Sequence, residues 1–199
     1  MELKIILIED QPKEAYQIQK AFTETFEWLE KADFISEMKI DKMSIEYVKG
    51  SLKNIAKGEE YLHYKDSDIS KIKDVLQKYK KNSNIKVAFL TDVLLTQGEV
   101  KRARVNDFSD IGMVNKICEE FEKDYPMYFI TGLNTFGSRV WSIIGKENLS
   151  RCYLQKERID ISSRTGMARV IYWLANKENI PFELKDKIEK KELDEKILK

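Results

Sequence analysis

Polar residues with chemically useful side chains stand at the ends of separate apolar segments of this sequence. In chain order they are Glu9 and Asp10, Asp92, Thr131 and Lys156. The set contains three carboxylates, one hydroxyl and one amine. Carboxylates that are held close together repel one another unless a hard cation such as Mg²⁺ lies between them. If the fold brings the three carboxylates together, we expect them to bind Mg²⁺.

A cluster of this kind suits the transfer of a phosphoryl group. An aspartate can act as a nucleophile toward phosphorus and form an aspartyl phosphate, and Asp92 is the best placed to do so. The new phosphoryl oxygens need hydrogen-bond donors or positive charge, which the hydroxyl of Thr131 and the ammonium group of Lys156 can supply. We therefore interpret Asp92, Thr131 and Lys156 as the residues that carry the chemistry.

The elements that must position these residues alternate between strands and helices. Short apolar runs predict five strands, at 3–8, 43–48, 85–90, 127–130 and 152–155. Apolar residues at helical spacing predict helices at 12–29, 69–80, 110–123, 136–144 and 162–176. Such alternation is typical of an α/β fold, a doubly wound parallel sheet with helices on both faces, whose ligands bind at the carboxyl ends of the strands. The segment 49–64 is expected to be irregular.

The order of the polar residues resembles that of the receiver domains of bacterial response regulators, which place an acidic pair, a phosphoacceptor aspartate, a threonine or serine, and a lysine in this sequence. The resemblance covers about 3–24 and 85–176. It implies a flavodoxin-like, five-stranded sheet of order 2-1-3-4-5, with an insertion between strands 1 and 3. It also implies that the chain is a phosphoacceptor signalling domain and not an enzyme acting on an external substrate.

The same resemblance implies roles for individual residues. Mg²⁺ would be bound by Glu9, Asp10, Asp92 and the backbone carbonyl of Leu94. Thr131 and Lys156 would contact the phosphoryl group. Tyr153, three residues before the lysine, matches an aromatic switch that turns inward when the threonine moves toward the phosphate. A histidine kinase or a phosphotransfer protein would donate the phosphoryl group, and a downstream protein target would read the change in the C-terminal helices.

Composition limits the other classes of function. The 35 basic and 34 acidic residues leave a net charge of +1, so no overall field draws the chain to nucleic acid or to a membrane. The apolar run at the N-terminus is too short to span a membrane, and we expect a cytoplasmic protein. We divide the chain into a receiver-like domain, 1–180, and a charged helical tail, 181–199, which we expect to be solvated and which could serve in a homodimer. A stand-alone receiver is therefore expected.

Several alternatives remain open. Thr96 and Glu157 stand where receivers usually have proline, and a basic loop lies at 97–110; these departures favour a receiver-like binding module that takes no phosphate. A phosphatase that uses Asp92 as nucleophile is a third interpretation. The segment 132–139 has the glycine spacing of a P-loop without its lysine, which argues against nucleotide hydrolysis. His63, the one histidine, could accept a phosphoryl group, but we expect it to be structural.

Overall fold

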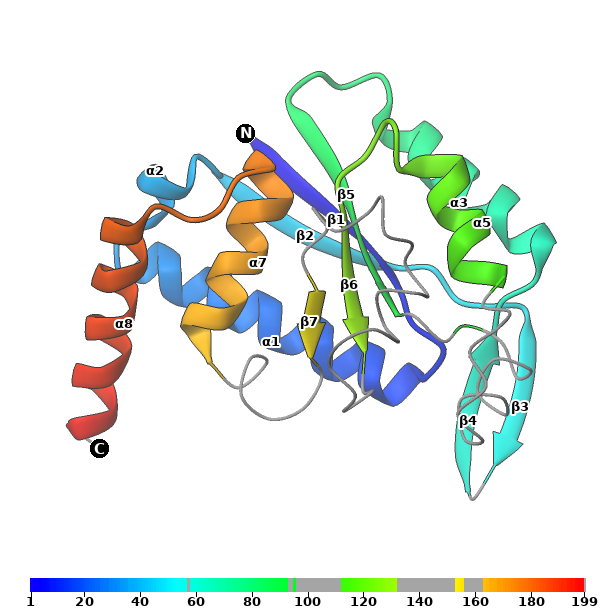
Figure 1. Cartoon of the computed structure of the whole chain (residues 1–199), viewed down its shortest axis with the longest axis horizontal. Helices are drawn as coiled ribbons and strands as arrows, with labels where there is room; N and C mark the ends of the chain where they lie inside the picture. Colours follow the sequence, from blue (N-terminus) through cyan, green and yellow to red (C-terminus); the bar gives the residue numbers. More distant parts are fainter. Residues whose placement is uncertain (57, 93–94, 96–111, 132–152, 156–162, 199) are drawn as a thin grey trace.

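A computed structural model describes residues 1–56, 58–92, 95, 112–131, 153–155 and 163–198, with the backbone alone for Ala56, Thr131 and 153–155. Its main element is a parallel sheet (Figure 1). The strands are β1 (Glu2–Ile8), β2 (Lys42–Tyr47), β5 (Ile85–Asp92), β6 (Met127–Thr131) and β7 (Tyr153–Gln155), in the order β2-β1-β5-β6-β7. The first four form the body of the sheet, and β7 pairs with β6 through three residues at the edge. The expected α/β class with a parallel sheet is confirmed.

Alternate side chains of β1 enter two separate hydrophobic cores, which explains why this strand is apolar throughout. Leu3, Ile5 and Leu7 pack on one face of the sheet, whereas Ile6 and Ile8 pack on the other. The first face is covered by α1 (Pro12–Lys31) and α7 (Arg164–Asn176), and the second by α3 (Asp66–Tyr79) and α5 (Gly112–Phe121). The sheet therefore has helices on both faces, as expected from the alternating pattern.

The segment between β2 and α3 forms an antiparallel hairpin, so the prediction of irregular structure there was wrong. Its strands are β3 (Leu52–Ala56) and β4 (Glu59–His63), and they make a two-stranded sheet beside the main one (Figure 1). Gly50 admits the close approach of this hairpin, because a Cβ at that position would lie 2.0 Å from the carbonyl oxygen of Leu62. The strands escaped prediction because they carry few buried apolar residues.

Asp68 fixes the start of α3 and joins it to the hairpin. Its carboxylate accepts the backbone N–H of Lys65, the N-cap residue of the helix, and also the N–H and hydroxyl of Ser51. Burial alone would raise the pKa of Asp68, but these hydrogen bonds and the one from Lys71 lower it overall. The helix consequently begins three residues before the predicted Ile69.

The C-terminal segment forms α8 (Phe182–Ile197), which packs against α7. Leu184 and Ile188 are buried in the same core as α1 and α7. Glu192, only 7% exposed, accepts the backbone N–H groups of Arg164 and Thr165 at the start of α7. The helix was expected, but one of its faces is buried and not solvated. In the described part of the chain no helix has the length and apolar character needed to cross a membrane.

The short helix α2 (Ile35–Met38) was also missed, and it lies between α1 and β2. Ser163 caps α7, because its hydroxyl accepts the N–H of Gly166 at 3.2 Å. The helix predicted at 136–144 lies outside the described residues.

Candidate functional site: an acidic cluster at the carboxyl edge of the sheet

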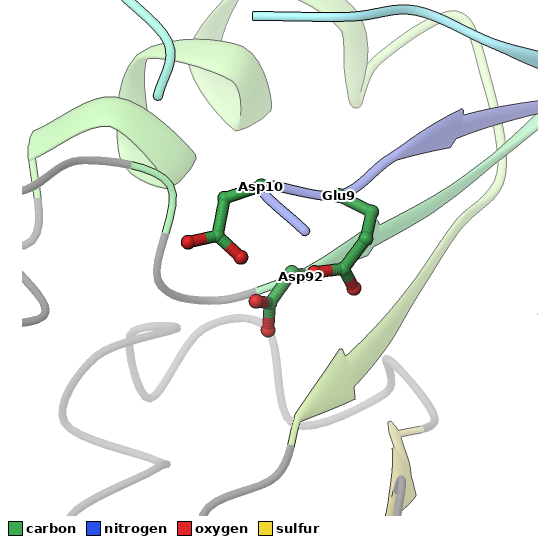
Figure 2. A group of neighbouring side chains, drawn as sticks. All are labelled: Glu9, Asp10 and Asp92. Carbon is green, nitrogen blue, oxygen red and sulfur yellow. The ribbon is translucent and has the colours of Figure 1, made fainter. Parts of the chain in front are cut away.

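Three carboxylates meet where β1 and β5 end. Glu9 and Asp10 directly follow β1, and Asp92 is the last residue of β5. The two strands are neighbours in register, with Ile8 opposite Thr91. One oxygen from each carboxylate lies within 4.8 Å of the other two, and Figure 2 shows the three side chains gathered there. The prediction that Glu9, Asp10 and Asp92 come together is confirmed.

The cluster is buried, which makes its electrostatics demanding. Glu9 is fully buried, Asp10 is 2% exposed and Asp92 is 5% exposed. Like charges repel more strongly where water is scarce, and buried carboxylates need compensating partners. A divalent cation would provide such compensation. The donor set contains only carboxylate oxygens, which fits a hard cation such as Mg²⁺ and not a soft metal ion that prefers thiolate ligands. Within the residues that the structure describes, this is the one group of three or more metal-binding side chains.

Two tyrosine hydroxyls hold the backbone of Glu9, one from the end of β2 and one from the residue that follows β4. The hydroxyl of Tyr47 donates to the carbonyl of Glu9 at 2.9 Å, and the hydroxyl of Tyr64 accepts the N–H of Glu9 at 3.2 Å. Tyr64 also donates to the carbonyl of Val48. Burial raises the pKa of both tyrosines, and the negative charges of Glu9 and Asp10 raise it further. The two phenols therefore remain protonated near neutral pH and keep these hydrogen bonds.

The side chain of Glu9 is also held locally. Its Oε1 accepts the backbone N–H of Gln11 at 3.1 Å, just before α1 begins at Pro12. This hydrogen bond fixes one carboxylate oxygen of Glu9 at the junction between β1 and α1. The acidic pair is thus positioned by the turn that leads from strand to helix.

The hairpin contacts the acidic pair directly, which sequence reasoning did not anticipate. The backbone N–H of Leu62 donates to the carbonyl of Asp10 at 2.6 Å. The next residue, His63, places its Nδ1 3.8 Å from Oδ2 of Asp10, and both side chains are almost completely buried. The sequence offered no signal for this neighbour, because the position of His63 depends on the register and docking of the hairpin.

The remaining predicted residues are described only in part. Thr131 ends β6, next to Ile130, which pairs with Asp92, so its backbone lies at the same edge of the sheet as the acidic cluster. Its own partner is Gln155, the last residue of β7, and Tyr153 is the first residue of that strand. The backbone pairing therefore brings the ends of β6 and β7 together, whereas the side chains of Thr131 and Tyr153 lie outside the described part of the chain.

Other predicted features fall outside the described residues: Leu94, Thr96, Lys156, Glu157, the basic loop at 97–110 and the glycine-containing segment at 132–139. The predicted contacts of Leu94 with a cation and of Lys156 with a phosphoryl group therefore stay predictions.

Comparison of the chain with protein-family models, with curated proteins and with solved structures finds no match. The functional interpretation therefore depends on the site itself.

Proposed function

We propose that this chain is a receiver-like signalling domain in which Asp92 accepts a phosphoryl group. The observation that carries the proposal is the meeting of Glu9, Asp10 and Asp92 within 4.8 Å at adjoining strand ends. The pairing of Thr131 with Gln155 at the ends of β6 and β7 supports it, since the proposed lysine is the next residue in the sequence after Gln155. The order of these segments across the sheet agrees with the receiver arrangement, with β1 between β2 and β5.

Glu9, Asp10 and Asp92 would hold Mg²⁺, with the carbonyl of Leu94 as a further ligand. When bound, the cation would neutralise the carboxylates and the phosphoryl oxygens. An oxygen of Asp92 attacks the phosphorus of a phosphohistidine or an acyl phosphate. The bond from phosphorus to the donor breaks, and the donor leaves with the electron pair. Glu9 and Asp10 keep the cation in place and do not react.

The phosphoryl oxygens would then be met by Thr131 and Lys156, and Tyr153 would change its position in response. The output would involve the C-terminal helices. In support, α7 begins soon after the segment that contains Lys156, and its first residues are held by Glu192 of α8. Only seven residues of the sequence separate Lys156 from the start of α7, so a change at the phosphoryl site would be passed to these helices. The donor would be a histidine kinase or a phosphotransfer protein, and a downstream protein would bind the altered face.

The experiment is phosphorylation in vitro. The protein is incubated with acetyl phosphate and Mg²⁺, and its intact mass is measured by mass spectrometry. We expect a gain of one phosphoryl group that disappears with EDTA and in Asp92→Asn. The matched control is Asp74→Asn, which changes an exposed aspartate on α3 and should leave the mass gain intact. A mass gain that persists in Asp92→Asn would refute the assignment.

One observation favours a second function, a receiver-like module that binds a protein partner without phosphorylation. The hairpin packs against Asp10, and the three carboxylates of the cluster are at most 5% exposed. This burial restricts the approach of a phosphodonor. If the wild-type protein takes up Mg²⁺ but gains no mass with acetyl phosphate and shows no change with beryllofluoride, this module becomes the better interpretation.

A further inference from the structure

The hairpin brings an imidazole to the outer side of the acidic cluster. His63 is the last residue of β4 and pairs with Leu52 on β3. Its side chain is 4% exposed, and its Nδ1 lies 3.8 Å from Oδ2 of Asp10. The preceding residue, Leu62, donates its N–H to the carbonyl of Asp10. Two consecutive hairpin residues therefore contact one residue of the cluster, one through the backbone and one through the side chain.

The Nδ1 atom of His63 is buried and has no hydrogen-bond partner among the described residues. Most buried polar atoms in proteins are hydrogen-bonded, and leaving one unpaired destabilises the folded state. The imidazole is nevertheless held in place, because the ring of Tyr61 stacks on it with centroids 6.0 Å apart and planes at 12°. An ordered, unsatisfied nitrogen that faces a carboxylate indicates a hydrogen bond that forms in another state of the site.

The distance of 3.8 Å between Nδ1 of His63 and Oδ2 of Asp10 is too long for a hydrogen bond, but a small side-chain rotation would bring the two atoms within hydrogen-bonding distance. A carboxylate has two oxygens, so one can face a cation while the other accepts a hydrogen bond. Carboxylates that bind metals are generally oriented in this way, and loss of the outer partner weakens metal binding by about 10–100-fold.

We propose that His63 is a positioning residue of the cation site: when a divalent cation binds, Nδ1–H of His63 donates to Asp10 and fixes its carboxylate toward Glu9 and Asp92. The inference rests on the proposed cation site and adds the hairpin to it. His63 does not bind the cation itself, because the group of mutually close ligand atoms contains Glu9, Asp10 and Asp92 but not His63.

The test measures cation affinity and cation-free stability in matched variants. Mn²⁺ serves as the probe, since its electron paramagnetic resonance signal reports the free ion. We expect His63→Leu to lower the affinity about 10–100-fold. Its thermal stability in EDTA should stay equal or increase, because the change removes an unpaired buried polar atom. His63→Asn should recover most of the affinity, since its amide nitrogen can occupy the place of Nδ1. Leu52→Ala, at the half-exposed position opposite His63, is the control for hairpin damage.

Each outcome decides between the inference and the site. Equal affinity of wild-type and His63→Leu protein would overturn the role of His63 and leave the cation site standing. Failure of the wild-type protein to bind Mn²⁺ would overturn both the site and the inference. If His63→Asn loses as much affinity as His63→Leu, and both melt earlier in EDTA, the histidine is a packing residue and the inference is wrong.

Discussion

Replacing Asp92 by asparagine should stabilise the cation-free protein, because it removes one of three charges from a buried cluster. Two unit charges 4.8 Å apart repel by about 3.5 kcal/mol at an effective dielectric constant of about 20. Asp92 faces two such neighbours. Side-chain rearrangement, screening and compensation by nearby groups reduce this value, and we expect a net gain of about 1–3 kcal/mol in the free energy of unfolding. For a chain of this size that corresponds to a melting temperature higher by roughly 2–12 °C.

The assay is thermal or urea denaturation followed by circular dichroism, in EDTA and in excess Mg²⁺. Wild-type protein should gain about 2.7 kcal/mol when Mg²⁺ is 100 times its dissociation constant. Asp92→Asn should gain much less, so that the order of stability reverses between the two conditions. Asp74→Asn, the exposed control, should follow the wild-type protein in both. An Asp92→Asn variant that is less stable than wild type in EDTA, or equally stabilised by Mg²⁺, would refute the electrostatic reasoning.

Three further predictions concern the supports of the site. Glu192→Ala should lower the free energy of unfolding, measured by urea titration, by about 2–3 kcal/mol, because charge-assisted hydrogen bonds to the start of α7 are lost. The control Glu189→Ala changes an exposed residue on α8 and should lower it by under about 0.5 kcal/mol. The pKa values of Asp68 and Glu192 are lowered in the folded state despite burial. Their contribution to stability should therefore be complete near neutral pH and be lost progressively as the pH falls below about 4. Acid unfolding curves of Asp68→Asn and Glu192→Gln, compared with wild type, measure this loss. Gly50→Ala should displace β4, since the new methyl group would lie 2.0 Å from the carbonyl oxygen of Leu62, and should lower both melting temperature and Mn²⁺ affinity; unchanged values would contradict the docking of the hairpin.

The strands of the main sheet were predictable because strands that are buried on both faces consist almost entirely of apolar residues. The run from Leu3 to Ile8 is apolar at every position except Lys4, and the structure buries its side chains on both faces. Once parallel strands are inferred, the meeting of Glu9, Asp10 and Asp92 follows from geometry, since the carboxyl ends of such strands share one edge. This part of the site needed no information beyond the sequence.

The hairpin was not predictable in the same way. Leu52 is half-exposed and Ile55 is mostly exposed, so β3 lacks the buried face that produces a clear alternation of apolar and polar residues. The contact of His63 with Asp10 depends on the register of this hairpin and on its docking through Leu62. Neither is encoded in local spacing. The histidine could therefore be recognised as part of the site only from the fold.

The packing of α8 was missed for a related reason. Its composition is mostly charged, and of its apolar residues Leu184 and Ile188 are buried whereas Leu193 and Ile197 are exposed, so the sequence does not show which face is buried. Glu192 is buried because it accepts hydrogen bonds from backbone N–H groups of α7. Every residue except proline has such a group, so the sequence does not show which of them Glu192 binds. A charge-rich helix can thus dock through capping interactions as well as through apolar contacts.

The most direct test of the central claim is chemical mapping of the phosphorylated residue. After incubation with acetyl phosphate and Mg²⁺, borohydride reduces an aspartyl phosphate to a stable alcohol, and tandem mass spectrometry of the peptides locates it. We predict that the reduced residue is Asp92 and that its formation requires Mg²⁺ and is lost in Asp10→Asn. Modification at another residue, or none at Asp92 in protein that binds the cation, would contradict the account.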